Sequence, residues 1–348
     1  MEEGAGGSGS RTGTRESAVT GSDGAGAAAP VLADGVGGGV VQDGDSLPAD
    51  ARGPCVELRA HGKVSPADAT PFAVPSGESY QCFHFRSPFE EGAQGVVVES
   101  ILEGEASVHH MLLYELLTPR EDGSFEPCLG THPDATLIAG WAPGAADLRF
   151  DEDVGMRLPD GDDGYFLLEV HYLNFGDASL TDRSGLRVCA AAEPRPHTAS
   201  ITWLGTENIG GPLGIPPGQL TTVSGSCTPG RVGIDEDDAI DLMVALPHMH
   251  VLGRRVEMLV HRTGGEVDRV LDVEFDADRQ VAHPLEVTIH PGDRIETRCT
   301  YDNTTDWGVP WGPGSGQEMC YVFTLAYPAG ALDNPVPSFA GATNTCFL

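Results

Sequence analysis

Three short histidine strings and one methionine are the residues of this sequence that could do chemistry. They are His109-His110-Met111, His171 within residues 169–174, His248-Met249-His250, and Met319. Imidazole is a ligand for copper, zinc, iron and nickel, whereas a thioether is a soft ligand that favours copper. Three histidines in one set, and two histidines with a methionine in another, predict two copper sites of different character.

The spacing within each histidine pair sets what a strand can do with it. His248 and His250 are two positions apart at the end of an apolar run, so on a strand both imidazoles point to one face and can reach one metal. His109 and His110 are adjacent and would point to opposite faces, so sharing a metal requires a β-bulge or a strand end. Taken singly, each string also fits ordinary surface or core histidines, and Met319 alone fits a core residue, because it precedes an apolar strand.

The overall composition limits the classes of partner. The chain has 348 residues and a net charge of −32, from 52 acidic and 20 basic residues. No basic run is present, which argues against nucleic acid as a partner. No segment approaches the ~18 apolar residues of a membrane span, so none is expected in the given chain.

Eight widely spaced cysteines without a C-x-x-C pair argue against a zinc ribbon or a thioredoxin-type motif. They favour structural disulfides in an oxidising compartment, which is extracellular, periplasmic or at the cell surface. The alternative is eight reduced, buried thiols in a cytosolic protein. Residues 1–30 lack the basic start and apolar core of a signal peptide, so export requires a leader removed or left out of this sequence, or another signal.

The distribution of apolar residues predicts an all-β fold. Residues 1–54 are rich in Gly, Ala, Ser and Asp and are expected to form a disordered tail, because they have almost nothing to bury. Beyond this tail, short apolar runs alternate with Gly, Pro and Asp, and no long stretch keeps a 3.6-residue period. The pattern indicates two antiparallel β-sandwich, jelly-roll-like domains, over residues 55–196 and 197–348, joined by the Pro-rich linker 193–196.

Taken together and in order, these strings resemble the copper type II, ascorbate-dependent monooxygenases, the family of peptidylglycine α-hydroxylating monooxygenase and dopamine β-hydroxylase. The resemblance covers residues 55–348. Each string is weak alone, but their order and spacing are specific. The matching segments are 109–111, 138–144, 168–174, 215–218, 247–253, 298–303 and 318–320.

The resemblance implies two coppers per chain, one in each domain. An electron-transfer copper would be bound by His109, His110 and His171. The oxygen-activating copper, where catalysis occurs, would be bound by His248, His250 and Met319. Ascorbate would supply electrons, O₂ would be the oxidant, and a C–H bond of a small-molecule substrate would be hydroxylated.

The family's disulfides, carried onto matching positions, use all eight cysteines. The implied pairs are Cys55–Cys189, Cys82–Cys128, Cys227–Cys346 and Cys299–Cys320. Two pairs would lie within each half of the folded region. Cysteine spacing alone does not determine this connectivity.

The sequence departs from the peptide-hydroxylating branch at three positions. That branch holds a substrate carboxylate with an Arg, an Asn and a Tyr, and Leu246, Tyr321 and Phe323 occupy those positions here. A glycine-extended peptide substrate is therefore not expected, and an apolar or aromatic substrate is favoured.

Two alternatives compete with the enzyme hypothesis. One is a non-catalytic copper-binding or carrier protein on the same fold, which would need only one of the two sites. The other is a zinc-binding β-sandwich, against which Met319 argues. Substrate identity, the physiological reductant, the oligomeric state and the role of the tail stay open.

Overall fold

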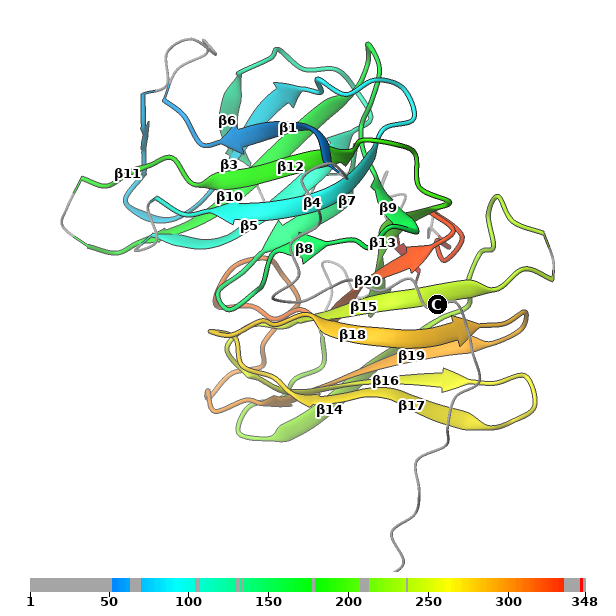
Figure 1. Ribbon diagram of the computed structural model, residues 1–348. Helices are drawn as coiled ribbons and strands as arrows, with labels where there is room; N and C mark the ends of the chain where they lie inside the picture. The colour runs from blue at the N-terminus through cyan, green and yellow to red at the C-terminus, as the bar shows by residue number, and fades with distance from the viewer. Residues whose placement is uncertain are drawn as a thin grey trace, which may run out of the picture. The chain divides into compact units, whose positions relative to one another are not determined.

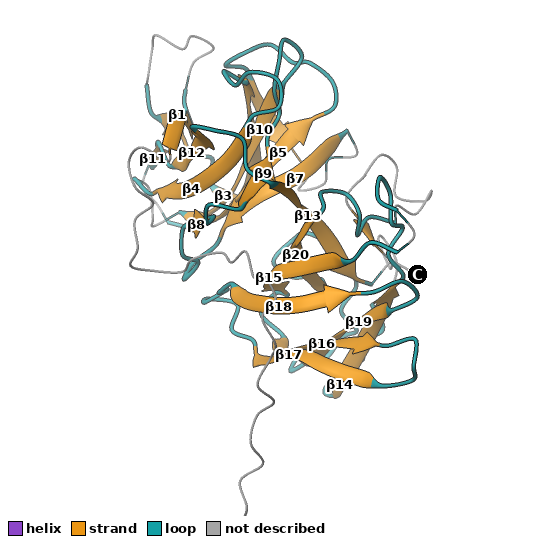
Figure 2. Ribbon diagram, turned by 45° about the vertical axis from the view of Figure 1, so that its right-hand side comes forward, coloured by secondary structure: helices purple, strands orange, loops and turns teal. Residues whose placement is uncertain are grey.

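The chain is described as a computed structural model for residues 52–62, 70–103, 107–128, 132, 134–176, 179–206, 213–235, 237–334 and 345–346. These residues form strands and loops without a helix, which confirms the predicted all-β class (Figures 1 and 2). Consequently, no helix among them is long and apolar enough to cross a membrane. Strand β1 begins at Arg52, three residues before the expected start of the first domain at Cys55, and residues 1–51 lie outside the described part.

The first half of the chain forms a sandwich of two sheets around one hydrophobic core. One sheet has the strand order β6-β3-β10-β5-β7, and it faces strands β1, β12, β4 and β9 of a larger sheet. Phe83 and Leu113 from the former pack in one cluster with Leu58 and Val188 from the latter. The bounds are β1 Arg52–Arg59, β3 Gly77–Arg86, β4 Gln94–Ile101, β5 Val108–Leu116, β6 Phe125–Cys128, β7 Ala135–Trp141, β9 Val154–Arg157, β10 Tyr165–Asn174 and β12 Gly185–Ala191.

Two short additions complete this half. Strand β8 (Leu148–Arg149) pairs with β4, and β2 (Phe72–Ala73) pairs with β11 (Thr181–Asp182) in a two-stranded sheet.

The second half is a sandwich of the same kind. The sheet β14-β19-β16-β17 faces β13, β20, β15 and β18, and its core includes Met258 and Tyr301 from one sheet and Leu204 and Val322 from the other. Strand β21 pairs with β13. The bounds are β13 His197–Gly205, β14 Leu220–Cys227, β15 Ile240–His248, β16 Gly253–His261, β17 Val267–Glu274, β18 His283–Ile289, β19 Arg294–Asp302, β20 Tyr321–Tyr327 and β21 Thr345–Cys346.

One sheet continues across the boundary expected at residues 193–196. That boundary falls between β12 and β13, yet β13 pairs in parallel with β9 on one side and antiparallel with β20 on the other. Strands β13, β20 and β15 are buried on both faces, because Ile201 and Leu325 pack into the first core while Leu204 and Val322 pack into the second. Two-sided burial explains why β15 and β20 are nearly continuous apolar runs.

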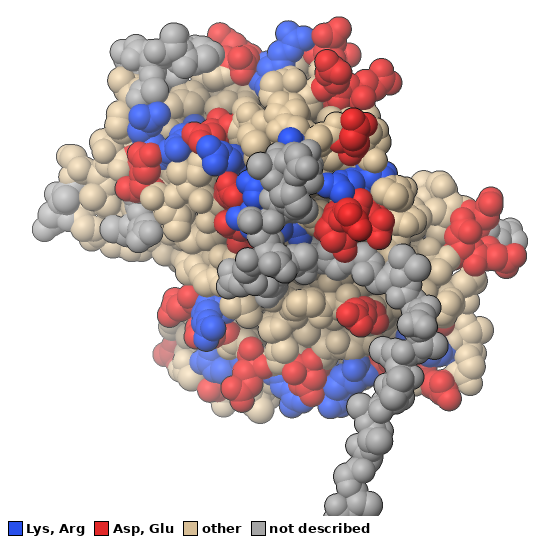
Figure 3. Space-filling view, viewed as in Figure 1, with Lys and Arg blue, Asp and Glu red and all other residues tan. Residues whose placement is uncertain are grey.

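Four disulfides are present, and they are the pairs that the family resemblance implied. They join Cys55 to Cys189, Cys82 to Cys128, Cys227 to Cys346 and Cys299 to Cys320. No cysteine in the described chain is free. On the face seen in Figure 3, acidic and basic side chains are intermixed over both halves, so the net negative charge is not concentrated there in one patch.

Candidate metal centre

A β-bulge brings the adjacent histidines of strand β5 to one place. In the pairing of β5 with β10, His110 lies opposite His171 and Val108 lies opposite Tyr172, so His109 is the extra residue. One donor atom from each of His109, His110 and His171 lies within 4.8 Å of the others. The β-bulge that a metal shared by adjacent histidines requires is therefore present. The extra residue changes the direction of the neighbouring side chain, so both imidazoles can lie on the same side.

The hydrogen bonds around His171 leave one specific nitrogen for a metal. Its Nε2 lies 3.0 Å from Oε1 of Glu78, so Nε2 carries the proton and donates it to the carboxylate. Its Nδ1 is buried and has no hydrogen-bond partner among the described residues. The Tyr80 ring stacks on the imidazole, with centroids 4.0 Å apart and planes at 8°, and fixes its orientation. A buried, unpartnered nitrogen beside two further imidazoles fits a metal ion of borderline softness.

Burial keeps the histidines of this cluster neutral. Desolvation lowers the pKa of His171 to about 4, and the neighbouring His109 contributes to the same direction. The pKa of His110 lies well below its usual value, because the residue is enclosed and surrounded by other histidines. Neutral imidazole is the form that binds metals, so the site does not have to release protons before a cation enters at neutral pH.

A second histidine pair lies at the end of strand β15. His248 is the last residue of the strand and His250 follows it in a turn, with ring centroids 5.4 Å apart. Between them, the Met249 side chain points into the second core, as strand alternation predicts. Desolvation lowers the pKa of His248 to about 3, and that of His250 is also lowered by burial.

Both histidines of this pair are held through Nδ1, in contrast to His171. Nδ1 of His248 lies 2.9 Å from Oε1 of Gln280, and Nδ1 of His250 lies 2.8 Å from the carbonyl oxygen of Gln317. Both acceptors are oxygens, so the protons reside on Nδ1 and the Nε2 atoms are the ones available to a metal.

The segment that carries Met319 is tied directly to this pair. The buried Glu318 carboxylate accepts hydrogen bonds from the backbone N–H groups of His250 and Leu252, at 2.8 and 2.7 Å. Desolvation raises the pKa of Glu318 to about 7 against the effect of these donors. Tyr301 donates its hydroxyl proton to the carbonyl of Met319, and Cys320 is joined to Cys299 on strand β19. Met319 is therefore fixed beside the turn that carries His250, although it follows it by 69 positions.

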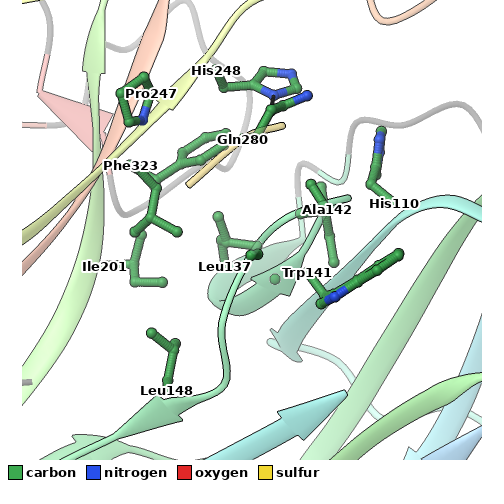
Figure 4. Close-up of a pocket in the computed structure, with 14 residues that line it drawn as sticks. His110, Leu137, Trp141, Ala142, Leu148, Ile201, Pro247, His248, Gln280 and Phe323 are labelled. Atoms are coloured by element: carbon green, nitrogen blue, oxygen red, sulfur yellow. Dashed lines mark hydrogen bonds between the residues drawn. The ribbon is translucent and has the colours of Figure 1, made fainter. Parts of the chain in front are cut away.

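The two histidine sets meet at one cavity. The ring centroids of His110 and His248 are 6.2 Å apart, and both residues line a cavity of ≈ 60 Å³. Figure 4 shows Gln280 beside His248, with Phe323 and Leu137 along the apolar wall. One histidine of each predicted set thus lies at this cavity, His110 from strand β5 and His248 from strand β15.

The three residues that differ from the peptide-hydroxylating branch, Leu246, Tyr321 and Phe323, have different surroundings. Leu246 and Phe323 line the cavity, whereas the buried Tyr321 accepts a hydrogen bond from Nε1 of Trp311 at 2.8 Å. Trp311 is therefore a packing residue, and Trp307 is exposed.

A third polar cluster lies away from the cavity. Nε2 of His132 lies 2.6 Å from Oε2 of the buried Glu169 and 3.7 Å from the sulfur of Cys82. Cys82 and Cys128 are joined, so neither offers a thiolate, and we assign this cluster a structural role.

Sequence reasoning missed the residues that orient the ligands. Glu78 and Gln280 belong to no motif; Glu78 reaches His171 only because β3 pairs with β10. Ligand chemistry offered one general reason to expect such residues. A histidine that binds a metal through one ring nitrogen usually donates the proton of the other ring nitrogen to an acceptor.

Comparison with known proteins places the chain in a family. The family model for the N-terminal domain of copper type II ascorbate-dependent monooxygenases matches residues 67–179, and that for the C-terminal domain matches residues 197–339. Among solved structures, the VP2 protein of infectious bursal disease virus aligns at 11% identity over 85% of this chain and 74% of that one, with a TM-score of 0.17, which is too low to carry an argument.

Curated relatives agree with the domain matches. DBH-like monooxygenase protein 1 of Gallus gallus is 32% identical over 302 residues, 76% of this chain and 48% of the relative. The Homo sapiens protein of the same name is 31% identical over 73% of this chain and 45% of its own length. Dopamine beta-hydroxylase of Rattus norvegicus is 30% identical over 83% of this chain and 48% of its own length. The chain thus spans about half the length of these relatives. With both domain models matched in order, this chain belongs to the copper type II ascorbate-dependent monooxygenase family.

Proposed function

We propose that the chain is a dicopper monooxygenase that hydroxylates a C–H bond of a small organic substrate, with O₂ as oxidant and ascorbate as reductant. One copper would be held by His109, His110 and His171, and the other by His248, His250 and Met319. The observation that carries the proposal is that two groups of histidines with lowered pKa values meet at one cavity, which His110 and His248 both line.

The donor sets differ in the way that the two tasks require. Bound copper would supply electron transfer from ascorbate at the all-histidine site and reduction of O₂ at the site with the thioether. A thioether is a soft donor and favours the reduced metal, whereas three imidazoles suit both oxidation states. Glu78 accepts the Nε2 proton of His171, and Gln280 accepts the Nδ1 proton of His248. The other nitrogen of each ring is thereby left free of a proton for copper.

The cavity wall serves the reaction by excluding water. Leu246, Phe323 and Leu137 place hydrocarbon beside His110 and His248. A substrate bound there would lie next to both histidine sets, and the apolar wall would keep bulk water from competing for reactive species.

The number of bound coppers and their reduction test the proposal. We expect two Cu²⁺ per chain, and ascorbate is expected to remove the Cu²⁺ electron paramagnetic resonance signal of both. His110→Ala and His248→Ala should each lose one copper, whereas His290→Ala, which removes an exposed histidine, should keep both.

Oxygen uptake separates an enzyme from a copper carrier. With ascorbate and a productive substrate, O₂ consumption should match the hydroxylated product. A chain that binds one copper, or binds two and is not reduced by ascorbate at both, would be a carrier and would contradict the proposal.

The disulfides support a compartment outside the reducing cytosol. Four disulfides support an extracellular, periplasmic, lumenal or cell-surface location, because cytosolic thiols are kept reduced.

A further inference from the structure

We propose that the cavity lined by His110 and His248 accepts a short, uncharged, apolar segment of the substrate, and that Leu246 and Phe323 determine this preference. The inference rests on the proposed function, since it identifies the class of substrate that the two histidine sets would serve. It assigns a substrate without a charged group close to the C–H bond that reacts.

The wall of the cavity contains no charged side chain. Both halves of the chain contribute to it, and apart from His110, His248 and Gln280 its side chains are apolar (Figure 4). Asp278 and Arg279 directly precede Gln280 in sequence, but neither lines the cavity. An ammonium or carboxylate group placed there would lose its hydration without gaining a counter-ion, which disfavours charged ligands strongly.

Gln280, the polar side chain of the wall besides the two histidines, makes most of its contacts within the protein. Oε1 of Gln280 accepts the Nδ1 proton of His248 at 2.9 Å, and Nε2 of Gln280 donates to the carbonyl of Ala277 at 3.2 Å. The Gln280 backbone N–H donates to the carbonyl of Pro143 at 3.0 Å. Pro247, also in the wall, has no N–H to offer. Only one N–H and one lone pair of the Gln280 amide are therefore left for a substrate group, and neither can neutralise a charge.

Leu246 and Phe323 form a directly paired element of this wall. Leu246 on β15 lies opposite Phe323 on β20. Along β15, Leu246 comes two positions before His248. Side chains two apart on a strand share a face, so Leu246 and His248 point to the same side. The Phe323 ring packs against the His248 imidazole, with centroids 5.5 Å apart. These two residues therefore present hydrocarbon immediately beside the second histidine pair.

The size of the cavity limits the segment that enters. At ≈ 60 Å³ it is smaller than an engineered protein cavity of roughly 150 Å³ that binds benzene. A chain of about four non-hydrogen atoms fits this space better than a complete aromatic ring. Ligands used to test the inference should therefore be short, so that a charged end group has to lie close to the apolar wall.

Three four-carbon probes that differ only in their end group test the inference. Butan-1-ol, butylammonium and butanoate would be titrated into the full chain, both copper-free and copper-loaded without ascorbate. Binding would be followed by ligand-observed NMR and by tryptophan fluorescence, to which Trp141 in the cavity wall contributes. Butan-1-ol is expected to bind at least about tenfold tighter than either ion. Equal affinities, tighter binding of an ion, or no binding of butan-1-ol would overturn the inference.

Substitutions at the paired residues locate the binding. Leu246→Arg places a cation in the wall and should reverse the order, so that butanoate binds more tightly than butan-1-ol, whereas the matched Leu246→Met should keep the wild-type order. Phe323→Ala enlarges the cavity and should allow 2-phenylethanol to bind. If correctly folded Leu246→Arg keeps the wild-type order, Leu246 does not determine the preference.

The binding test and the test of the proposed function can fail separately. Selective binding of butan-1-ol to a chain that shows no ascorbate-dependent O₂ consumption would leave the cavity assignment intact and contradict the enzyme. Coupled O₂ consumption that occurs only with substrates charged next to the reacting C–H bond would support the enzyme and contradict the cavity assignment.

Discussion

The Glu78 carboxylate accepts the Nε2 proton of His171 and also two hydrogen bonds from Ser315. The distance to His171 Nε2 is 3.0 Å, and those to the backbone nitrogen and hydroxyl of Ser315 are 3.0 and 3.1 Å. Two positions further along β3, Tyr80 stacks on His171 and donates its hydroxyl proton to the carbonyl of Pro313 at 2.6 Å. Strand β3 therefore connects the first histidine set to the loop that leads to Gln317, which holds His250.

Removing the carboxylate at Glu78 should weaken the first copper site. In Glu78→Ala, His171 loses the acceptor that fixes its ring, and copper affinity at this site is expected to fall about 10–100-fold. Competition with a chelator of known affinity would measure it. Ser315→Ala is the matched control, because it removes one hydroxyl contact to Glu78 and leaves the His171 contact intact. Equal affinity in wild type and Glu78→Ala would show that the carboxylate does not support this ligand.

Met319→Ile should separate copper binding from turnover. The substitution keeps an apolar side chain of similar size but removes the thioether, so copper at the three-histidine site should persist while hydroxylation is lost. Copper counting and product analysis would measure both. Met258→Ile, a buried methionine of the second core, provides a control that should retain activity. Full activity in Met319→Ile would remove this residue from the oxygen site.

The disulfide next to Met319 should matter for copper binding beyond its effect on stability. Replacing Cys299 and Cys320 by Ser opens a loop of 21 residues. In the chain-entropy model, this lowers the unfolding free energy by about 3 kcal/mol. Copper affinity at the second site is also expected to fall, because Met319 loses a fixed neighbour.

The control for that variant is the disulfide between Cys55 and Cys189. Its loop of 134 residues predicts a larger loss, of about 5 kcal/mol, at a place on β1 and β12 that contacts neither site. Denaturant unfolding and copper titration on both double variants would show whether stability and metal binding separate. If both double variants lower the copper affinity equally, the loss reflects overall destabilisation and not the position of Met319.

Asp333 should make the protein less stable as the pH rises from about 4 to 7. Desolvation raises the pKa of this carboxyl group to about 7, although Thr202 donates a hydrogen bond to it at 2.6 Å. Between the unfolded and folded pKa values the native state binds the extra proton, so the unfolding free energy falls with rising pH, by about 4 kcal/mol in total.

Asp333→Asn should therefore be more stable than wild type at pH 8 and indistinguishable from it at pH 3, as measured by urea unfolding at both values. Asp272→Asn is the contrasting variant. Its carboxylate pairs with Arg255 at 2.6 Å and its pKa is lowered by that contact, so neutralising it should slightly destabilise the protein at pH 8. A pH-independent effect of Asp333→Asn would contradict the buried-carboxyl explanation.

The sequence by itself determined the donor types, the strand character and the number of cysteines. Short apolar runs between Gly and Pro suffice for an all-β class, because strand length and alternation are local properties. The histidines and Met319 could be singled out because ligand chemistry depends on residue type, although their assignment to two coppers stays a prediction until metal is counted.

Only the tertiary structure decided how these donors converge and what surrounds them. The bulge at His109 exists because β5 pairs with β10 in one register, and Glu78 meets His171 across 93 positions of sequence. Likewise, the continuous sheet through β9 and β13, the contact of Gln280 with His248, and the opposition of Leu246 and Phe323 depend on pairing and packing between distant segments. Such contacts have no local signal, because sheet register is set by the burial of whole faces and not by the residues that happen to meet.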